Sequence, residues 1–462
     1  MKPCGCSLAF LTVFLVFVIP LAGACNGGGG HDAGEDTGND PDGADDEGSI
    51  DPPAEDMPAD EISPEAEIPD TAEDFSEPPD DIADDSGEEA VGPSCGADAV
   101  NVTDRGVTGD GETDDTAAIQ ALFDDGSVDS IFFPAGTYMI GLQSECGACA
   151  LRIERDGLTV CGEGAASILK LTDPGSDSRT VRAINVTGDD VSLVDFTLDG
   201  SRIPGTGWEY EQEHGVFVFD DAARFHARGL EIHHFQGDGI FLYRAQDAVV
   251  HENFVHDCWR AALNLEVGTG TDCHDNRVER CNSGVHIEMD TDGTVNADTW
   301  IHHNTIAPLQ PDTESGGTGI VLNGRADGLL RTVVELNTID QTDDPAPYSA
   351  IICATTSGAI LRSNTIIGSV DSQHGILTAW YGNTGMTMEG NILEDCTTNA
   401  PVKCGGATVA TPNDGITVHD NVARSSCTWT GIPYGDSFDG GFVWVVGAAP
   451  TTNLDAHDNV FE

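Results

Sequence analysis

The chain has 462 residues, of which 80 are Asp or Glu and only 19 are Lys or Arg, so its formal net charge is -61 at pH 7. This acidic composition argues against two kinds of partner, nucleic acid and an anionic lipid surface, because proteins bind both through clusters of Lys and Arg. It leaves room for an acidic polysaccharide, provided that arginines or calcium ions gather at one place. The length fits two or three ordinary domains or one long repeat structure.

Residues 1–24 are expected to be a targeting segment rather than part of the fold. Lys2 precedes an apolar run that ends in Leu21-Ala22-Gly23-Ala24-Cys25. This resembles a bacterial lipoprotein signal, in which the cysteine is lipidated and becomes the first residue, although Ala22 stands where Leu is usual. The resemblance implies lipidation at Cys25 and an exported protein, either anchored by lipid at the outer membrane or cell surface or secreted. An ordinary secretory peptide cleaved nearby is the alternative, and the run is too short for a comfortable transmembrane helix.

Residues 25–94 form a predicted disordered linker. Four glycines open it at Gly27 to Gly30, and Asp, Glu, Pro, Ala and Gly fill most of the rest. Few apolar side chains and many like charges leave little to bury, so self-repulsion should keep the segment extended. A spacer that lifts a domain off a membrane is favoured over a calcium-binding role for the acids.

The folded part is predicted to span residues 95–462, beginning with a module over 95–140. Thr113 or Asp114 should cap a helix with an apolar side, Asp125-Gly126 should end it, and the strand Ile131-Phe132-Phe133 comes next. From about residue 102 to 140 this opening resembles the N-terminal module of the pectate-lyase-like superfamily. The resemblance implies an all-β fold, a right-handed parallel β-helix whose N-terminal end the helix caps. It implies little about chemistry, because this fold hosts lyases, hydrolases, epimerases and pure binding proteins.

A short sequence motif recurs through the second half of the chain: a polar residue, then Asn, then an apolar or β-branched residue. Successive asparagines are between 23 residues (Asn253 to Asn276) and 38 residues (Asn421 to Asn459) apart, a spacing that predicts a solenoid of about 9–11 coils. The asparagines should stack at a tight turn, where Asn tolerates left-handed backbone geometry and its amide bonds along the stack. The histidines two residues earlier are interpreted as a periodic surface row and not as a site. The stack would comprise Asn253, Asn276, Asn304, Asn337, Asn364, Asn391, Asn421 and Asn459.

A second repeat, a small residue followed by an apolar one, marks the strand that each coil adds to a parallel sheet. Alternation along these strands assigns one set of side chains to the core and the other to an outward face. The predicted core set is Val216, Val218, Ile240, Leu242, Leu263, Leu265, Val285, Ile287, Ile320 and Leu322. The predicted outward set is Phe217, Phe219, Phe241, Tyr243, Asn264, Glu266, His286, Glu288, Asp290, Asn323, Arg325, Leu377, Ala379 and Tyr381.

A site for a sugar polymer requires carboxylates, a histidine and an arginine beside aromatic rings. The rings stack on pyranose faces, and the carboxylates serve as acid and base. The strip Tyr243, Glu266, Glu288 and Arg325 is the centre of this hypothesis. The candidate catalytic residues are Glu266, Glu288, His286, Arg325 and Asp238. The candidate substrate-binding residues are Tyr243, Phe241, Asn264, Asn323, Arg260 and Tyr381. Calcium is the one expected cofactor, and it would be held by Glu266, Glu288 and Asp290.

Two enzymatic mechanisms and one binding role fit this strip. In a lyase, calcium would neutralise a uronate carboxylate, and an arginine or His286 would remove the neighbouring proton. In a glycoside hydrolase two carboxylates would flank the bond, but the Arg-x-Lys of the polygalacturonase family is absent and His214-Gly215 is only a fragment of its Gly-His-Gly. The alternative is a non-catalytic surface protein that binds a glycan or acts as an adhesin.

Cysteine spacing predicts disulfides, since an exported chain meets oxidising conditions. Cys258 and Cys281 each lie five residues after an asparagine of the repeat, so they should face each other across adjacent coils and form a disulfide. Cys396 has the same offset, with Cys404 and Cys427 as open alternatives for its partner. Cys146 and Cys149 are expected to form a local disulfide, with Cys161 nearby.

Overall fold

The computed structural model describes residues 95–143, 149–172, 182–201, 212–288, 296–307, 309, 317–324, 329–344, 349–369, 375–405, 411–429, 431–432, 436–447 and 451–462. The predicted signal segment, the linker and Cys25 lie outside these ranges and stay predictions. Within them, no helix is long and apolar enough to cross a membrane.

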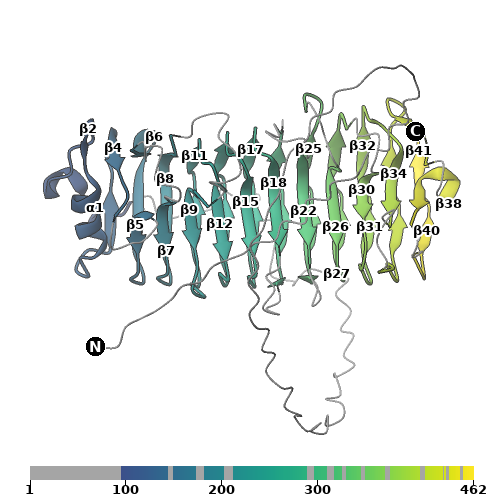
Figure 1. Cartoon of the computed structure of the whole chain (residues 1–462), viewed down its shortest axis with the longest axis horizontal. Coiled ribbons are helices and arrows are strands. Elements are labelled where there is room, and N and C mark those ends of the chain that lie inside the picture. The colour runs from purple at the N-terminus through teal and green to yellow at the C-terminus, as the bar shows by residue number, and fades with distance from the viewer. Residues whose placement is uncertain are drawn as a thin grey trace, which may run out of the picture. The chain divides into compact units, whose positions relative to one another are not determined.

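The described residues from Cys95 onwards coil into a solenoid, in which strands of successive coils stack into long parallel arrays, here called sheets 1, 2 and 3 (Figure 1). Sheet 1 takes one parallel strand from each of eleven described coils and one antiparallel strand, β38, at its C-terminal edge. Its strands are β5 (Cys149–Ile153), β7 (Arg182–Val186), β9 (Val216–Val218), β12 (Ile240–Tyr243), β15 (Ala261–Glu266), β18 (Ser283–Glu288), β22 (Thr318–Asn323), β26 (Ile351–Ala354), β30 (Gly375–Ala379), β34 (Ala400–Cys404), β39 (Val443–Val445) and β38 (Asp436–Phe438).

Sheets 2 and 3 run side by side and share the long strands β6 and β8. Sheet 2 holds β1 (Val100–Asn101), β3 (Ser130–Phe132), β6 (Thr159–Leu171), β8 (Ser192–Asp199), β10 (His226–Arg228), β13 (Val249–His251), β16 (Asp272–His274), β20 (Trp300–His302), β24 (Val333–Glu335), β28 (Ile360–Arg362), β31 (Thr387–Glu389), β35 (Thr417–His419) and β40 (Asp455–His457). Sheet 3 adds β2 (Asp110–Asp114), β4 (Gly136–Ile140), β11 (Glu231–His233), β14 (Phe254–His256), β17 (Arg277–Glu279), β21 (Thr305–Ile306), β25 (Thr338–Asp340), β29 (Thr365–Ile367), β32 (Ile392–Glu394), β36 (Val422–Ala423) and β41 (Val460–Phe461). Small pairings involve β19 (Asn296–Ala297), β23 (Leu329–Leu330), β27 (Thr356–Ser357), β33 (Thr397–Thr398) and β37 (Thr428–Trp429), and the 3-10 turns are η1 (Val102–Arg105) and η3 (Asp439–Gly441).

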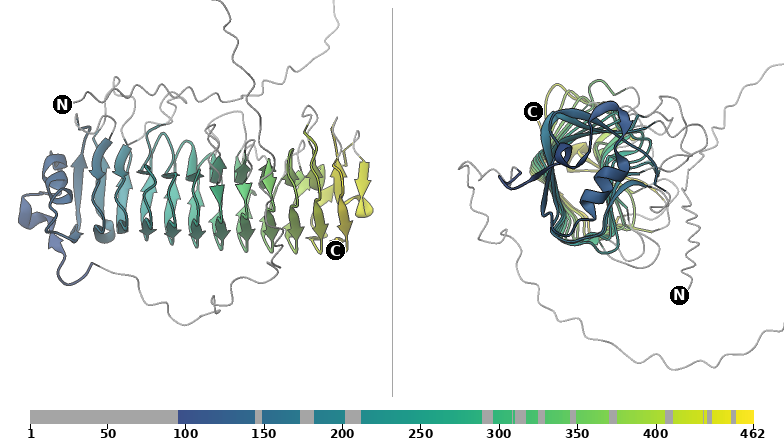
Figure 2. Two further views of the ribbon diagram at one scale, coloured as in Figure 1. Left: turned by 90° about the horizontal axis from the view of Figure 1, so that it is seen from below. Right: turned by 90° about the vertical axis from the view of Figure 1, so that its left-hand side faces the viewer.

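Helix α1 (Thr116–Phe123) lies across the N-terminal end of the solenoid, where it buries Ile119, Leu122 and Phe123 (Figure 2). This confirms the predicted cap, which removes the first coil's apolar interior from water. The predicted cap is Thr113 or Asp114, whereas the helix begins one or two positions later, with Asp115 at the N-cap. The Asp115 carboxylate instead accepts hydrogen bonds from the N–H groups of Thr108 (2.8 Å) and Gly109 (3.0 Å), while Asp114 accepts one from the N–H of Thr116 (3.0 Å).

The core agrees with the predicted alternation. All ten residues assigned to the core of sheet 1 are at most 2% exposed. The outward assignment fails at its last members: Leu377 pairs with Ile351 and Ala379 with Cys353, and both side chains are fully buried. The predicted register is wrong by one residue at Gly375, so Thr378 takes the outward position in this coil.

The predicted asparagine stack is present at the corner between sheets 2 and 3. Asn337 is typical: its Nδ2 donates to the carbonyl of Ile301 (2.9 Å) and to Oδ1 of Asn364 (3.0 Å), and its own Oδ1 accepts from the N–H of Asn304 (3.0 Å). The left-handed backbone lies one residue earlier than predicted, as at Leu336 with a φ of 56°. The asparagine is therefore the buried hydrogen-bonding residue of the corner, and its predecessor makes the turn.

Disulfides differ from the prediction. Cys95 and Cys161 are bonded, with a Cα separation of 5.8 Å, and Cys149 is also in a disulfide, while Cys146 lies outside the described residues. The predicted bond between Cys258 and Cys281 is absent. The two residues do lie two positions after the paired residues His256 and Glu279, and their thiols interact with each other as free thiols. The sulfur atoms also lie 3.6 Å and 3.4 Å from the carbonyl oxygens of His256 and Glu279.

The structure places Cys427, and not Cys404, next to Cys396. Its backbone N–H lies 3.3 Å from Sγ of Cys427, whereas Cys404 belongs to sheet 1. All three are free thiols, so the disulfide expected at Cys396 is not formed.

Candidate active site on the outward face of sheet 1

One outward row of sheet 1 brings together residues from five consecutive coils. The strand register places Asn185 beside Phe217, Phe217 beside Phe241, Phe241 beside Asn264, and Asn264 beside His286. Two residues further along the strands, Tyr243 pairs with Glu266. The structure thus confirms that these predicted residues share a face, and the aromatic rings form a cluster, with Phe217 and Phe241 5.1 Å apart.

Asp238 is the centre of a buried hydrogen-bond network at the start of this row. It lies just before β12 and is fully buried. Its Oδ1 accepts from the N–H of Ala261 (2.9 Å), and its Oδ2 accepts from Arg260 Nη1 (3.3 Å) and Asn264 Nδ2 (3.2 Å). Burial raises the pKa of Asp238, and Arg260, the Ala261 N–H and Asn264 offset only part of that shift.

His214 occupies the equivalent position one coil earlier and is also fully buried. Its Nδ1 accepts a hydrogen bond from the backbone N–H of Asp238 (3.0 Å), so the ring proton is on Nε2. Burial, together with Arg182 and Arg260, lowers the pKa of His214 well below its ordinary value, so the ring is neutral. The 3.4 Å approach of Nδ1 to the Asp238 carboxylate is therefore not an ion pair. Nε2 is buried and has no hydrogen-bond partner among the described residues.

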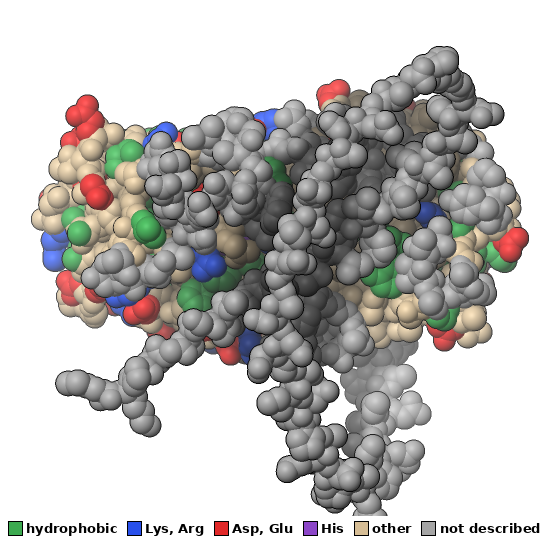
Figure 3. Space-filling model, in the orientation of Figure 1, with side chains coloured by type: hydrophobic (Ala, Val, Ile, Leu, Met, Phe, Trp, Pro, Cys, Tyr) green, Lys and Arg blue, Asp and Glu red, His purple; other side chains and the backbone are tan. Residues whose placement is uncertain are grey.

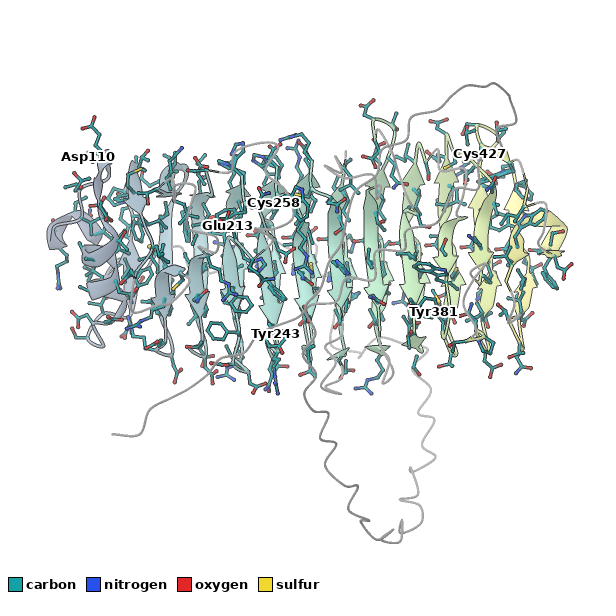
Figure 4. The ribbon with its side chains drawn as sticks, viewed as in Figure 1. Asp110, Glu213, Tyr243, Cys258, Tyr381 and Cys427 are labelled. Carbon is teal, nitrogen blue, oxygen red and sulfur yellow. A yellow bond between two sulfur atoms is a disulfide. The ribbon has the colours of Figure 1, made fainter. Side chains whose placement is uncertain are left out.

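Glu213, labelled in Figure 4, adds a titratable carboxyl one residue before His214 in the chain. It is half-buried, and burial raises its pKa to about 7. The backbone places it one coil before Gly237, whose N–H donates to the Glu213 carbonyl (2.9 Å), while Arg260 lies one coil later. Such a carboxyl is present in both protonation states near neutral pH, which suits proton transfer.

Arg182 supplies a cation at the edge of the aromatic cluster. Its guanidinium lies 4.1 Å from the centre of the Phe217 ring, and Nη2 donates to Oε1 of Gln212 (3.4 Å). Its Nε is buried without a partner among the described residues, and burial lowers the pKa of Arg182 to about 10. The group stays charged at neutral pH and could bind an anion.

The structure describes only some of the residues of the predicted strip. Glu266 and Tyr243 are neighbours, and Asn323 pairs with the backbone of Glu288, but the Glu288 side chain, Asp290 and Arg325 lie outside the described part of the chain. Tyr381 lies on a coil closer to the C-terminus (Figure 4).

The site predicted from the sequence did not include Glu213, His214 and Arg182. A signal was available for Glu213 and His214: they precede Gly215-Val216 as Gly237 and Asp238 precede Gly239-Ile240.

Of the predicted calcium ligands, Glu266 is the one whose side chain belongs to the described part of the chain. Among the described residues, one other group could hold a metal ion: Asp199, His233 and His234, at the ends of β8 and β11. Two imidazoles suit zinc or copper better than calcium, and Asp199 already pairs with Lys170 Nζ at 2.7 Å. This group belongs to sheets 2 and 3 and is not part of the row on sheet 1.

Comparisons with known proteins agree with the fold. A family model described as rhamnogalacturonase A/epimerase, pectate lyase-like, matches residues 99–189, and one for the right-handed β-helix region matches residues 182–345. The chain is therefore a right-handed parallel β-helix protein. It belongs to the pectate-lyase-like group of that fold, as the opening module predicted.

Sequence relatives include the mannuronan C5-epimerase AlgE4 of Azotobacter vinelandii, 36% identical over 110 residues, which are 22% of this chain and 20% of that protein. Alginate lyase 7 of the same organism is 32% identical over 108 residues, covering 22% and 13% of the two chains. The matched segments thus span at most about a fifth of these two relatives.

Similar solved structures include the A-module of the mannuronan C5-epimerase AlgE6 of Azotobacter vinelandii, with a TM-score of 0.53, 17% identity and coverage of 77% of this chain and 99% of that one. An exopolygalacturonase from Thermotoga maritima has a TM-score of 0.52, 11% identity and coverage of 80% and 93%. At these identities the structural similarity concerns the fold.

Proposed function

We propose that this protein is an enzyme that modifies an acidic polysaccharide by removing the proton beside a uronate carboxylate. The observation that carries the proposal is the network of Asp238, Arg260 and Asn264 beside the aromatic row of sheet 1, with Glu213 one coil before Gly237. The relatives named mannuronan C5-epimerase and alginate lyase support the choice of a uronate polymer such as alginate. Lyase and epimerase chemistry share this proton removal. They differ in the next step, which breaks the glycosidic bond in a lyase and returns a proton to the opposite face in an epimerase.

The protonation states at the site suggest a role for each of its residues. Arg182 would bind the uronate carboxylate, because its guanidinium remains charged and its Nε lacks a partner among the described residues. Glu213 would accept the proton, since a pKa of about 7 provides a strong base that is still ionised in half of the molecules at that pH. His214 is fully buried and would position the site from below, through the hydrogen bond that its Nδ1 accepts from the N–H of Asp238. Tyr243, which is half-buried, would pack against a sugar ring, with the buried rings of Phe241 and Phe217 supporting it from behind.

Calcium is retained as a proposed cofactor in the predicted set Glu266, Glu288 and Asp290. It would neutralise the uronate carboxylate and acidify the adjacent proton. If so, a calcium chelator should abolish turnover, and added calcium should restore it.

The direct test is incubation with sodium alginate and with polygalacturonate in deuterated water, with NMR as the readout. Exchange of the proton beside the carboxylate, with or without new double bonds, would support the proposal. Glu213→Gln should lower the exchange rate at least 100-fold, while Glu252→Gln, a matched change at an exposed corner, should leave it unchanged. If the wild type binds a polymer but gives neither exchange nor new reducing ends, the non-catalytic glycan-binding alternative is favoured.

Export on the N-terminal segment, with a lipid on Cys25, remains part of the proposal. Metabolic labelling with a radioactive fatty acid should mark the wild type and not Cys25→Ser.

A further inference from the structure

Two histidines at the end of β11 face an aspartate at the end of β8. His233 pairs with Asp199 across adjacent coils, and His234 follows in a left-handed backbone conformation with a φ of 59°. The two Nδ1 atoms are 2.5 Å from each other, and each is 3.7 Å from Oδ1 of Asp199. At 3.7 Å neither imidazole is hydrogen-bonded to that oxygen. Three atoms that could ligate a metal ion therefore converge on one place.

The contact between the two rings leaves a nitrogen lone pair available. Two Nδ1–H groups cannot face each other at 2.5 Å, so at least one of these nitrogens carries no proton. Burial lowers the pKa of His233 despite the nearby Asp199 carboxylate, so this ring is neutral at pH 7. A neutral imidazole is the form that binds a metal ion.

The spacing of the three atoms is close to what a zinc-type ion needs. Zinc binds imidazole nitrogen and carboxylate oxygen at roughly 2.0–2.2 Å in a tetrahedral arrangement, which sets the ligand atoms about 3.3 Å apart. The two nitrogen–oxygen distances would then shorten by about 0.4 Å, and the nitrogen–nitrogen distance would lengthen by about 0.8 Å. The His234 side chain is 45% exposed, so its ring has room for this movement.

Outer contacts hold two of the three side chains in place. Oδ2 of Asp199 accepts a hydrogen bond from Nζ of Lys170 (2.7 Å), and Oδ1 accepts one from the N–H of Ser201 (2.9 Å). A second lone pair of Oδ1 is left for an ion. The ring of His256, one coil further on, stacks on that of His233 with the centres 5.0 Å apart. Contacts of this kind orient the ligands of metal sites.

The next coil shows what distinguishes this corner. The residues equivalent to His233 and His234 are His256 and Asp257. The Asp257 carboxylate accepts hydrogen bonds from Nδ1 of His256 (2.6 Å) and from Arg280 (2.8 Å), so opposite charges meet there. Two adjacent imidazoles cannot neutralise each other in this way, whereas a shared cation would satisfy both.

The charge of the chain favours the approach of a cation. Its 80 acidic residues far outnumber its 19 basic ones. On the face shown in Figure 3, the Lys and Arg side chains lie apart from one another and form no large basic patch. A negative potential raises the local concentration of cations at the surface.

We propose that Asp199, His233 and His234 bind a divalent transition-metal ion such as zinc, which links the coil of β8 to that of β11. Water would complete the coordination of the ion. Calcium and magnesium do not fit, because they prefer oxygen ligands and two of the three ligands here are nitrogens. The group lies on sheets 2 and 3, so this proposal is independent of the function proposed for sheet 1.

The test is isothermal titration calorimetry of the full chain, made without a polyhistidine tag and stripped with chelator, with zinc chloride as the titrant. The wild type should bind zinc at this site, and calcium chloride should not compete. His234→Asn should lower the affinity at least 100-fold, since losing a ligand costs more than the 10–100-fold typical of losing an outer contact. Asn tolerates the left-handed backbone at this position, so the turn is retained.

A second variant and a control complete the experiment. Asp199→Asn keeps the shape of the side chain and should also weaken zinc binding. His251→Asn is the matched control, because His251 lies on sheet 2, where its Nε2 is 2.8 Å from that of His226. This variant should bind zinc as the wild type does, and circular dichroism would confirm that all three variants are folded.

Several results would overturn the proposal. One is a wild type that binds no zinc, and another is wild-type affinity in folded His234→Asn and Asp199→Asn, which would place the ion elsewhere. An equal loss in His251→Asn would assign the zinc to the histidines of sheet 2. Competition by calcium at similar concentration would show that the site does not select transition metals.

Discussion

Removing one asparagine from the middle of the stack should cost far more stability than removing the last. In Asn337→Ala, four hydrogen bonds disappear: two from Nδ2, to Ile301 and Asn364, and two received by Oδ1 from the N–H and Nδ2 of Asn304. Asn337 is 1% exposed, so water cannot replace them. At about 1 kcal/mol for each bond, the expected loss is about 4 kcal/mol.

Asn459→Ala is the matched control. The Asn459 side chain makes equivalent bonds, to the carbonyl of Val418 (2.9 Å) and from Asn421, but it is half-buried at the last coil. Water can therefore satisfy the groups that it leaves, and the expected loss is about 1 kcal/mol.

Urea unfolding monitored by circular dichroism would measure both variants, and hydrogen exchange would show whether the loss is confined to neighbouring coils. Local loss is expected, because each coil of a solenoid contacts only its neighbours. If the two variants lose equal stability to within about 0.5 kcal/mol, the reasoning from burial and bond count is refuted.

Three further predictions concern charge, pH and a cross-link. Asp238→Asn should destabilise the protein by about 3 kcal/mol in urea unfolding, because it removes the buried carboxylate to which Arg260, Asn264 and the Ala261 N–H donate, and a loss below about 1 kcal/mol would contradict this. Burial lowers the pKa of His251 to about 4. The unfolded chain therefore binds this proton first as pH falls, and up to about 2 kcal/mol should be lost between pH 7 and pH 5. His251→Phe should flatten this dependence, and an unchanged slope would show that other groups cause it. Reducing the Cys95–Cys161 disulfide, whose cysteines are 66 residues apart, should cost up to about 4 kcal/mol, measured by comparing unfolding with and without reductant.

The sequence alone determined the architecture of this protein. The opening module predicted the capping helix, and the spacing of asparagines such as Asn253 and Asn276 predicted the solenoid. Alternation along each strand identified the core, because side chains of a strand point to opposite faces in turn. The same rule by itself put Phe241, Asn264 and His286 on one face.

Only the tertiary structure decided where the titratable groups meet. Asp238 and Arg260 are 22 residues apart in the chain and become partners because one coil returns above the other. Glu213 gains its raised pKa from burial, which the surrounding coils create. The misassignment of Leu377 has a similar origin: the length of the preceding loop sets the register, and a shift of one residue moves a side chain from the surface to the core.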